Sequence, residues 1–158
     1  MNLVEISSSG SPGEEINRLP AVATEVCAAY VNLYKSVGFV RPWLGYFALR
    51  NSVCIGTCGF KGPPENNRVE IAYFTFPEYE GCGYATQMAR TLVERTWEAN
   101  ANVIVAAQTL PTESASTAIL KRLGFAPIGS VSHPEDGEVW EWQLRCHQVR
   151  WRPSDFHL

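Results

Sequence analysis

The residues best suited to chemistry lie together in the stretch from Glu70 to Ala89. Residues 70–76 are rich in β-branched and aromatic side chains, which is typical of a strand, and Pro77 cannot continue a strand ladder. A turn with two glycines follows, and from Tyr84 onward apolar side chains recur at helical spacing. Such a strand, turn and helix direct several backbone N–H groups and the positive end of a helix dipole at one point. The stretch therefore predicts a phosphate-binding site, although ordinary turn chemistry gives the same pattern.

The spacing within the turn narrows the choice of ligand. Residues 80–85 place glycine and then alanine at the last two fixed positions of the pattern R/Q-x-x-G-x-G/A. No third glycine follows, as a Rossmann fingerprint requires, and no Gly-Lys-Ser/Thr follows, as a P-loop requires. The turn resembles the acetyl-CoA-binding turn of the GNAT N-acetyltransferases, although Glu80 stands where that family usually has arginine or glutamine.

This resemblance implies a path for acetyl-CoA as the acyl donor. Backbone amides of the turn and of the first helical turn would hold the pyrophosphate, and the end of the preceding strand would pair with the pantetheine arm. The residues implied are Gly81, Cys82, Gly83, Tyr84, Ala85 and Thr86 for the pyrophosphate, and Phe74, Thr75 and Phe76 for the pantetheine arm. The Thr86 hydroxyl could instead bond its own helix backbone.

A second motif follows in the order that the family requires. Residues 112–125 resemble the pattern N-x-x-S-x-x-x-L-x-K-x-G-F of the RimJ/RimL-like branch, with Glu113 where asparagine is usual. Alone, this segment is better explained as an ordinary amphipathic helix that ends at Gly124, and only its place after the first motif favours the family pattern. Residues 136–142 also resemble the last strand of that branch. The resemblance extends over about residues 44–144.

Acetyl transfer to an amine needs a proton acceptor, because a free alkyl amine has a pKa near ~10.4 and attacks only when neutral. Glu70 is the candidate base, since it begins the strand that leads to the turn and resembles the catalytic glutamate of histone acetyltransferases in the same superfamily. The alternative for Glu70 is a surface carboxylate. The tyrosine with which many GNAT enzymes protonate the leaving thiolate is replaced by Leu120. By analogy with the RimJ/RimL-like branch, Ser116 would position the sulfur.

Several elements must position these residues. The patterns predict one mixed α/β (α+β) domain over residues 1–158, with residues 1–15 and 146–158 peripheral or poorly ordered. The GNAT resemblance implies a mostly antiparallel sheet with one splayed parallel strand pair and helices on both faces. The expected strands are 3–6, 44–49, 53–60, 68–76, 103–108, 125–131 and 139–144; the expected helices are 19–37, one that begins at 84, and one that begins at 111–113 with Ala115, Ala118, Ile119 and Leu123 inward.

Composition excludes some classes of function. A net charge of −3 gives no general attraction to nucleic acid or to anionic membranes, and no apolar run approaches the ~20 residues that span a bilayer. The first residues lack the pattern of a secretory signal. An odd count of five cysteines suggests free thiols in a reducing cytoplasm, and no metal site is expected.

The sequence therefore predicts an N-acetyltransferase that uses acetyl-CoA and acts as a monomer or homodimer. Its acceptor would be a primary amine: a protein N-terminus, an amino acid, a polyamine or another small amine. The alternative is an inactive CoA-binding or protein-interaction module on the same fold, which the departures at Glu80 and Glu113 favour.

Overall fold

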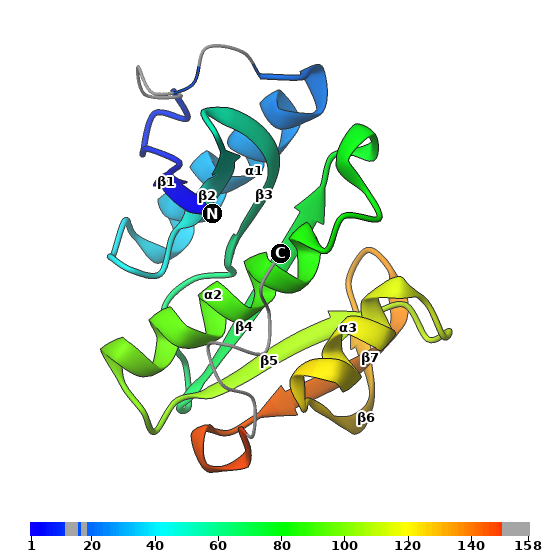
Figure 1. Cartoon of the computed structure of the whole chain (residues 1–158). Coiled ribbons are helices and arrows are strands. Elements are labelled where there is room, and N and C mark those ends of the chain that lie inside the picture. The colour runs from blue at the N-terminus through cyan, green and yellow to red at the C-terminus, as the bar shows by residue number, and fades with distance from the viewer. Residues whose placement is uncertain (12–15, 17–18, 150–158) are drawn as a thin grey trace.

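The computed structural model of the protein describes residues 1–11, 16 and 19–149. Within these residues a seven-stranded sheet combines with three α-helices and two short 3₁₀ helices (Figure 1). In chain order the elements are β1 (Asn2–Glu5), α1 (Ala21–Val37), β2 (Gly45–Arg50), β3 (Val53–Phe60), β4 (Arg68–Thr75), η1 (Pro77–Tyr79), α2 (Tyr84–Ala99), β5 (Ile104–Thr109), α3 (Ala115–Leu123), β6 (Ala126–His133), β7 (Gly137–Leu144) and η2 (Cys146–Gln148).

The sheet has the strand order β1-β2-β3-β4-β5-β7-β6. Neighbouring strands are antiparallel except β4 and β5, which run parallel because the helix α2 carries the chain back between them. The predicted fold class, mixed α/β with a mostly antiparallel sheet and one parallel pair, is confirmed. β1 forms the edge of the sheet, as expected for the N-terminal segment.

The parallel pair β4–β5 is short and then splays. The two strands share only the pairings from Arg68↔Ile104 to Glu70↔Ala106. Beyond Glu70, β4 remains paired with β3, whereas β5 from Ala107 onward pairs with β7. Figure 1 shows the two strands diverging from this common origin. The sheet therefore has a V-shaped opening with Glu70 at its vertex, and we call this opening the β4–β5 gap.

Helices cover both faces of the sheet. Side chains of successive strand residues point to opposite faces, and in β2 the residues Phe47 and Tyr46 belong to different buried clusters. Phe47 packs with Cys27 of α1, and Tyr46 packs with Leu92 of α2. The helix α3 joins the cluster of α2 through Leu120. Thus α1 lies on one face, and α2 and α3 lie on the other.

The ring of Tyr30 in α1 packs against glycine residues in β2 and β3. Gly45 and Gly59 are cross-strand neighbours. A Cβ on Gly45 would lie 2.6 Å from Tyr30 Cγ, and one on Gly59 would lie 2.5 Å from the Tyr30 hydroxyl oxygen. Two glycines at this pairing therefore let α1 pack closely on the sheet, which fixes the C-terminal end of α1 beside the β3–β4 loop.

The start of α3 differs from the prediction. The helix begins at Ala115 because the Ser114 hydroxyl accepts from the Thr117 amide and the Thr117 hydroxyl accepts from the Ser114 amide, a reciprocal cap that ends the preceding loop. The expected start at residues 111–113 is therefore wrong. The buried residues of α3 are Thr117, Leu120 and Leu123, whereas Ala115 and Ala118 are exposed.

Parts of the predicted peripheral segments, namely residues 12–15 and 150–158, lie outside the described residues. In the described part of the N-terminal segment, Leu3 and Ile6 are buried. In the described part of the tail, Cys146–Gln148 forms the short helix η2. No helix among the described residues is long and apolar enough to cross a bilayer.

Candidate active site

The vertex of the β4–β5 gap is occupied by the carboxylate of Glu70. Its side chain is only 12% exposed, its Oε2 lies 2.7 Å from Lys61 Nζ, and its Oε1 lies 3.5 Å from Arg68 Nη2. The contact with Lys61 lacks the alignment of a hydrogen bond, so charge attraction holds the pair together. Glu70 is thus an enclosed carboxylate beside two cations, and the alternative of a plain surface carboxylate does not describe it.

A second carboxylate fixes the position of Arg68. Glu141 in β7 is buried and accepts hydrogen bonds from Arg68 Nε at 3.2 Å and from Arg68 Nη2. Burial raises the pKa of Glu141, but the hydrogen bonds from Arg68, Gln143 and Gln108 outweigh burial and leave that pKa below its ordinary value. Glu141 therefore stays ionised and orients Arg68 towards the vertex.

Two cavities flank this group of charges. The first, of about 520 Å³, lies between the C-terminal end of α1 and the β3–β4 loop, and its lining includes Glu65, Arg68 and Glu70. The second, of about 400 Å³, lies between the end of β5, the start of α3 and the β6–β7 turn, and its lining includes Ser116. The two candidate catalytic residues thus line different cavities. Lys61 lines both cavities. The sequence placed the 61–67 loop at the acceptor pocket but did not single out Lys61 as a site residue.

The backbone of β4 offers unpaired groups to the gap. The Lys61 amide donates to the Glu70 carbonyl at 2.9 Å, and the Phe76 amide donates to the Ile55 carbonyl at 3.0 Å, so the even-numbered residues of β4 face β3. Strand alternation then turns the N–H and C=O groups of Ile71, Tyr73 and Thr75 towards the gap beyond Glu70.

This alternation refines the expected pantetheine path. Of the three residues implied by the resemblance, Thr75 faces the gap, whereas Phe74 and Phe76 turn their backbone groups towards β3. Ile71 and Tyr73 were missed, because the residues that face the gap are set by the register of β4 with β3, which the sequence alone does not give. The Thr75 hydroxyl is buried without a hydrogen-bond partner. An unpaired buried hydroxyl beside open backbone groups fits a ligand that carries amide groups, as the pantetheine arm does.

The turn before α2 leaves backbone amides without a side-chain acceptor. Gly81 and Gly83 adopt φ of 78° and 80°, which side chains other than glycine rarely tolerate. Gly83 is the N-cap of α2, and no side chain caps the helix, so the first amides of α2 are left for another acceptor. A Cβ on Gly81 would meet nothing within 4 Å, so the turn is open. These features fit the expected pyrophosphate site.

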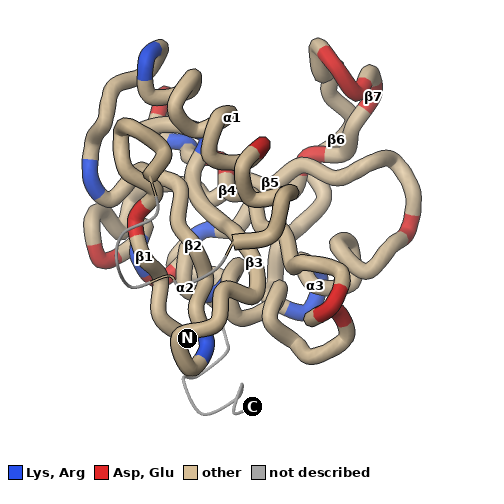
Figure 2. The backbone as a smooth tube through the Cα atoms, turned by 90° about the horizontal axis from the view of Figure 1, so that it is seen from above, with Lys and Arg blue, Asp and Glu red and all other residues tan. Residues whose placement is uncertain are grey.

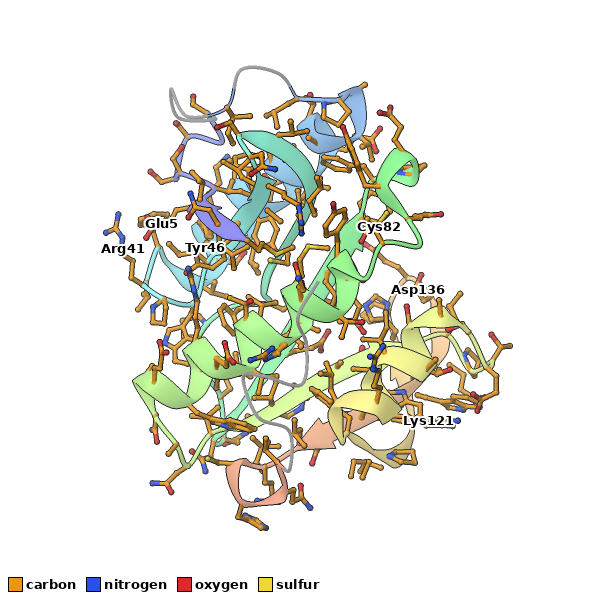
Figure 3. All side chains as sticks on the ribbon, viewed as in Figure 1. Glu5, Arg41, Tyr46, Cys82, Lys121 and Asp136 are labelled. Atoms are coloured by element: carbon orange, nitrogen blue, oxygen red, sulfur yellow. The ribbon has the colours of Figure 1, made fainter. Side chains whose placement is uncertain are left out.

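The remaining residues assigned to this site lie in the same turn. Cys82 is exposed and is labelled in Figure 3, Tyr84 and Ala85 are half-buried, and Thr86 is buried in the first turn of α2. Arg50 at the end of β2 places its guanidinium 5.6 Å from the centre of the Tyr84 ring. Sequence reasoning missed this cation, because Arg50 lies 34 positions before Tyr84 in the sequence and gives no local signal.

The motif position Glu113 has a structural partner. Its carboxylate accepts from the Thr117 hydroxyl at 3.1 Å and pairs with Lys121 Nζ at 2.9 Å, and these two hydrogen bonds lower its pKa. Ser116 is exposed in the first turn of α3. Glu113, which departs from the family pattern, is therefore held by two residues of α3, Thr117 and Lys121. Ser116 remains in the lining of the second cavity.

Acidic residues mark the tip of the β6–β7 hairpin. Figure 2 shows this hairpin projecting from the body of the molecule with Asp and Glu positions at its end. The amides of Glu135 and Asp136 both donate to His133 Nδ1 at 3.1 Å, which closes the turn. His133 and Asp136 also line the second cavity, so the hairpin turn forms part of its wall.

The described residues do not favour a reactive thiol at the buried cysteines or a metal site. Cys27, Cys54 and Cys58 are buried free thiols, and burial raises the pKa of Cys54 to about 11 and that of Cys58 to about 12. Those two thiols therefore stay protonated near neutral pH. Among the residues that the structure describes, no three His, Cys, Asp or Glu side chains are grouped closely enough to hold a metal ion.

Comparison with known proteins agrees with this geometry. A family model described as acetyltransferase (GNAT) domain matches residues 18–126. No curated protein sequence matches the chain significantly.

Solved structures share the fold at low sequence identity. The ribosomal-protein-alanine N-acetyltransferase from Brucella melitensis is 16% identical with a TM-score of 0.64, covering 92% of this chain and 99% of that one. RimL, a ribosomal L7/L12 alpha-N-protein acetyltransferase in complex with coenzyme A, is 16% identical with a TM-score of 0.62 (78% and 71%). The aminoglycoside acetyltransferase AAC(6')-Ib, also with coenzyme A, is 19% identical with a TM-score of 0.57 (66% and 67%). The chain therefore belongs to the GNAT acetyltransferase family, in its RimJ/RimL-like branch, and is an acetyl-CoA-dependent N-acetyltransferase.

Proposed function

We propose that the enzyme transfers the acetyl group directly from acetyl-CoA in the β4–β5 gap to a primary amine beside Glu70. The observation that carries the proposal is the position of Glu70, an enclosed carboxylate at the last residue pair before the strands part. Acetyl-CoA supplies the activated acyl group; the residues around it hold and orient the reactants. The fold of the neighbours supports the cofactor, but their low identity says nothing about the acceptor.

Binding of the cofactor is assigned to backbone groups. The pyrophosphate would lie on the amides from Gly81 to Thr86, where α2 starts without a capping side chain. The pantetheine amides would pair with the open edge of β4, at Ile71, Tyr73 and Thr75, with Phe74 and Phe76 holding this edge against β3. Electrostatic attraction also comes from Arg50 near the first residue of α2.

The acceptor is assigned to the cavity of about 520 Å³ beside Glu70. Its lining carries the carboxylates of Glu65 and Glu70 beside the cations Lys61 and Arg68. An acceptor that arrives as an ammonium group must lose a proton before it attacks the thioester. Glu70 would take that proton, either directly or through one water molecule. Ser116 would hydrogen-bond the departing sulfur from the second cavity, as a positioning group rather than as a strong acid.

The acceptor class is a primary amine, such as a protein N-terminus, an amino acid, a polyamine or another small amine. Neighbours with this fold include enzymes described as ribosomal-protein and aminoglycoside acetyltransferases. We also propose a reducing cytoplasm as the site of action, since all five cysteines are free thiols, and a monomeric or homodimeric state.

A panel of amines tests this proposal. The purified protein would be incubated with acetyl-CoA and each class of amine, and free thiol would be measured as coenzyme A is released. We expect thiol release that depends on one class of amine. Binding of acetyl-CoA without amine-dependent thiol release across all classes would contradict the proposal and favour a CoA-binding module.

A further inference from the structure

The amine nearest to the proposed base belongs to the protein itself. Lys61 follows the last residue of β3, and its Nζ lies 2.7 Å from Glu70 Oε2. Its side chain is 47% exposed, so it is neither locked in the core nor extended freely into solvent. Lys61 is also the residue that the linings of the two cavities share, since it lies between the one that contains Glu70 and the one that contains Ser116.

This placement meets the requirements of an acetyl acceptor. An amine that attacks a thioester needs a proton acceptor within hydrogen-bond reach and access to the carbonyl carbon. Glu70 provides the proton acceptor. Access to the carbonyl carbon comes from the cavity that contains Ser116, because Lys61 lines that cavity as well. Holding both reactants in one site also removes the entropic cost of a bimolecular encounter.

We propose that Lys61 is a self-acetylation site, modified by acetyl-CoA bound in the same molecule. This inference rests on the proposed function, because it places the thioester at the vertex of the β4–β5 gap. Neutral Nζ attacks the acetyl carbonyl carbon; a new N–C bond forms, and the thioester C–S bond breaks with its electron pair on sulfur. Of the two protons lost from the original ammonium group, one passes through Glu70 to water and one ends on the coenzyme A thiol.

Acetylation would change the charge of the site. An acetylated lysine is uncharged, so the ion pair between Lys61 and Glu70 is lost. Arg68, whose Nη2 lies 3.5 Å from Glu70 Oε1, then remains as the cation beside the carboxylate. The modification would therefore free one oxygen of Glu70 for an incoming amine.

The chain offers a matched internal control for the experiment. Its three lysines are Lys35, Lys61 and Lys121. Lys121 is also paired with a glutamate, at 2.9 Å from Glu113 Oε2, and its side chain is 53% exposed. It lies on α3 and is labelled in Figure 3. Lys61 and Lys121 thus have similar exposure, and each pairs with a glutamate. They differ in their place relative to the gap and in the exposure of that glutamate, which is 12% for Glu70 and 67% for Glu113.

The test follows acetylation of each lysine over time by peptide mass spectrometry, after the full chain is mixed with acetyl-CoA alone. We expect Lys61 to be acetylated at least about tenfold faster than Lys121, at a rate per molecule that does not change on dilution. Glu70→Gln should remove this preference, and Lys61→Arg should abolish the fast modification. Thermal melts of both variants check that the chain remains folded.

Two results overturn the inference. Equal rates at Lys61 and Lys121 in the parent protein would show surface chemistry without catalysis, and a fast rate at Lys61 that survives in folded Glu70→Gln would remove the proposed base. Calorimetry with acetyl-CoA distinguishes failure of the proposed function from failure of self-acetylation at Lys61. Absence of cofactor binding defeats the proposed function as well, whereas binding with slow modification of Lys61 defeats only this inference.

Discussion

Among single residues, the carboxylate of Glu70 matters most to the proposed chemistry. Glu70→Gln keeps the shape of the side chain and removes its ability to accept a proton, so kcat should fall by about 10²–10⁴-fold. The Kd for acetyl-CoA should change little, because the cofactor is assigned to backbone groups of β4 and α2. Steady-state kinetics with an acceptor from the amine panel and calorimetry with the cofactor provide the two measurements.

Glu65→Gln is the matched control for this prediction. Glu65 lines the same cavity but is exposed in the β3–β4 loop, so its loss should affect KM more than kcat. Loss of a base should reduce kcat far more than a few-fold. If the activity of Glu70→Gln stays within roughly a few-fold of the parent, Glu70 is not the base.

The pairing of Glu141 with Arg68 makes stability depend on pH. The pKa of Glu141 is lowered in the folded protein, so its ionised form contributes stability above the ordinary value near ~4.3, and this contribution is lost as the pH falls through the folded pKa. Glu141→Gln should lower the free energy of unfolding by about 1–3 kcal/mol at neutral pH. The difference should shrink below pH ~4.3, as urea titrations over a pH series can measure.

Glu113→Gln is the comparison for this series. Its pKa is also lowered, but its carboxylate is exposed, so solvent screening should make the effect on unfolding smaller. A difference between the parent and Glu141→Gln that stayed constant at every pH would mean that side-chain packing, and not ionisation, explains the loss of stability.

At the scale of elements, the contact between α1 and the sheet depends on Gly45. The three atoms nearest to a Cβ there are ring atoms of Tyr30, so Gly45→Ala should lower the free energy of unfolding by about 1–3 kcal/mol through overpacking. In the background of Tyr30→Ala, the same substitution should cost much less, because the ring is gone. Chemical denaturation of the two single variants and the double variant gives the coupling energy. Additive effects would contradict the close contact.

The elements also show what the sequence could and could not predict. Strand and helix types followed from local patterns, and the parallel β4–β5 pair followed from its connecting helix. The start of α3 did not follow, because the cap formed by Ser114 and Thr117 outweighs the helical spacing that precedes it. Lys61 and Arg50 could not be placed, because their contacts with Glu70 and Tyr84 depend on which strands lie side by side.

At the scale of the whole molecule, one structural feature organises the protein. The sheet is continuous from β1 to β6 in its pairing order, yet β4 and β5 separate after three residue pairs. The opening lies between the uncapped start of α2 and the charged group around Glu70. Binding and chemistry are therefore assigned to two ends of one gap, and this arrangement was predicted from the family resemblance rather than from periodicity.

Calorimetric titration of acetyl-CoA into the parent protein, Gly83→Val and Gly124→Val tests this central assignment most directly. Gly83 and Gly124 both have positive φ, so each substitution should strain the backbone and reduce stability to a similar degree. Gly83 is the N-cap of α2, whereas Gly124 ends α3 away from the turn.

We expect the parent and Gly124→Val to bind acetyl-CoA with similar affinity, and folded Gly83→Val to show no binding heat at about millimolar cofactor. A Cβ at position 83 would obstruct the approach of the pyrophosphate to the first amides of α2. Near-parental affinity in Gly83→Val, or no binding by the parent itself, would contradict the assignment of the cofactor to this gap.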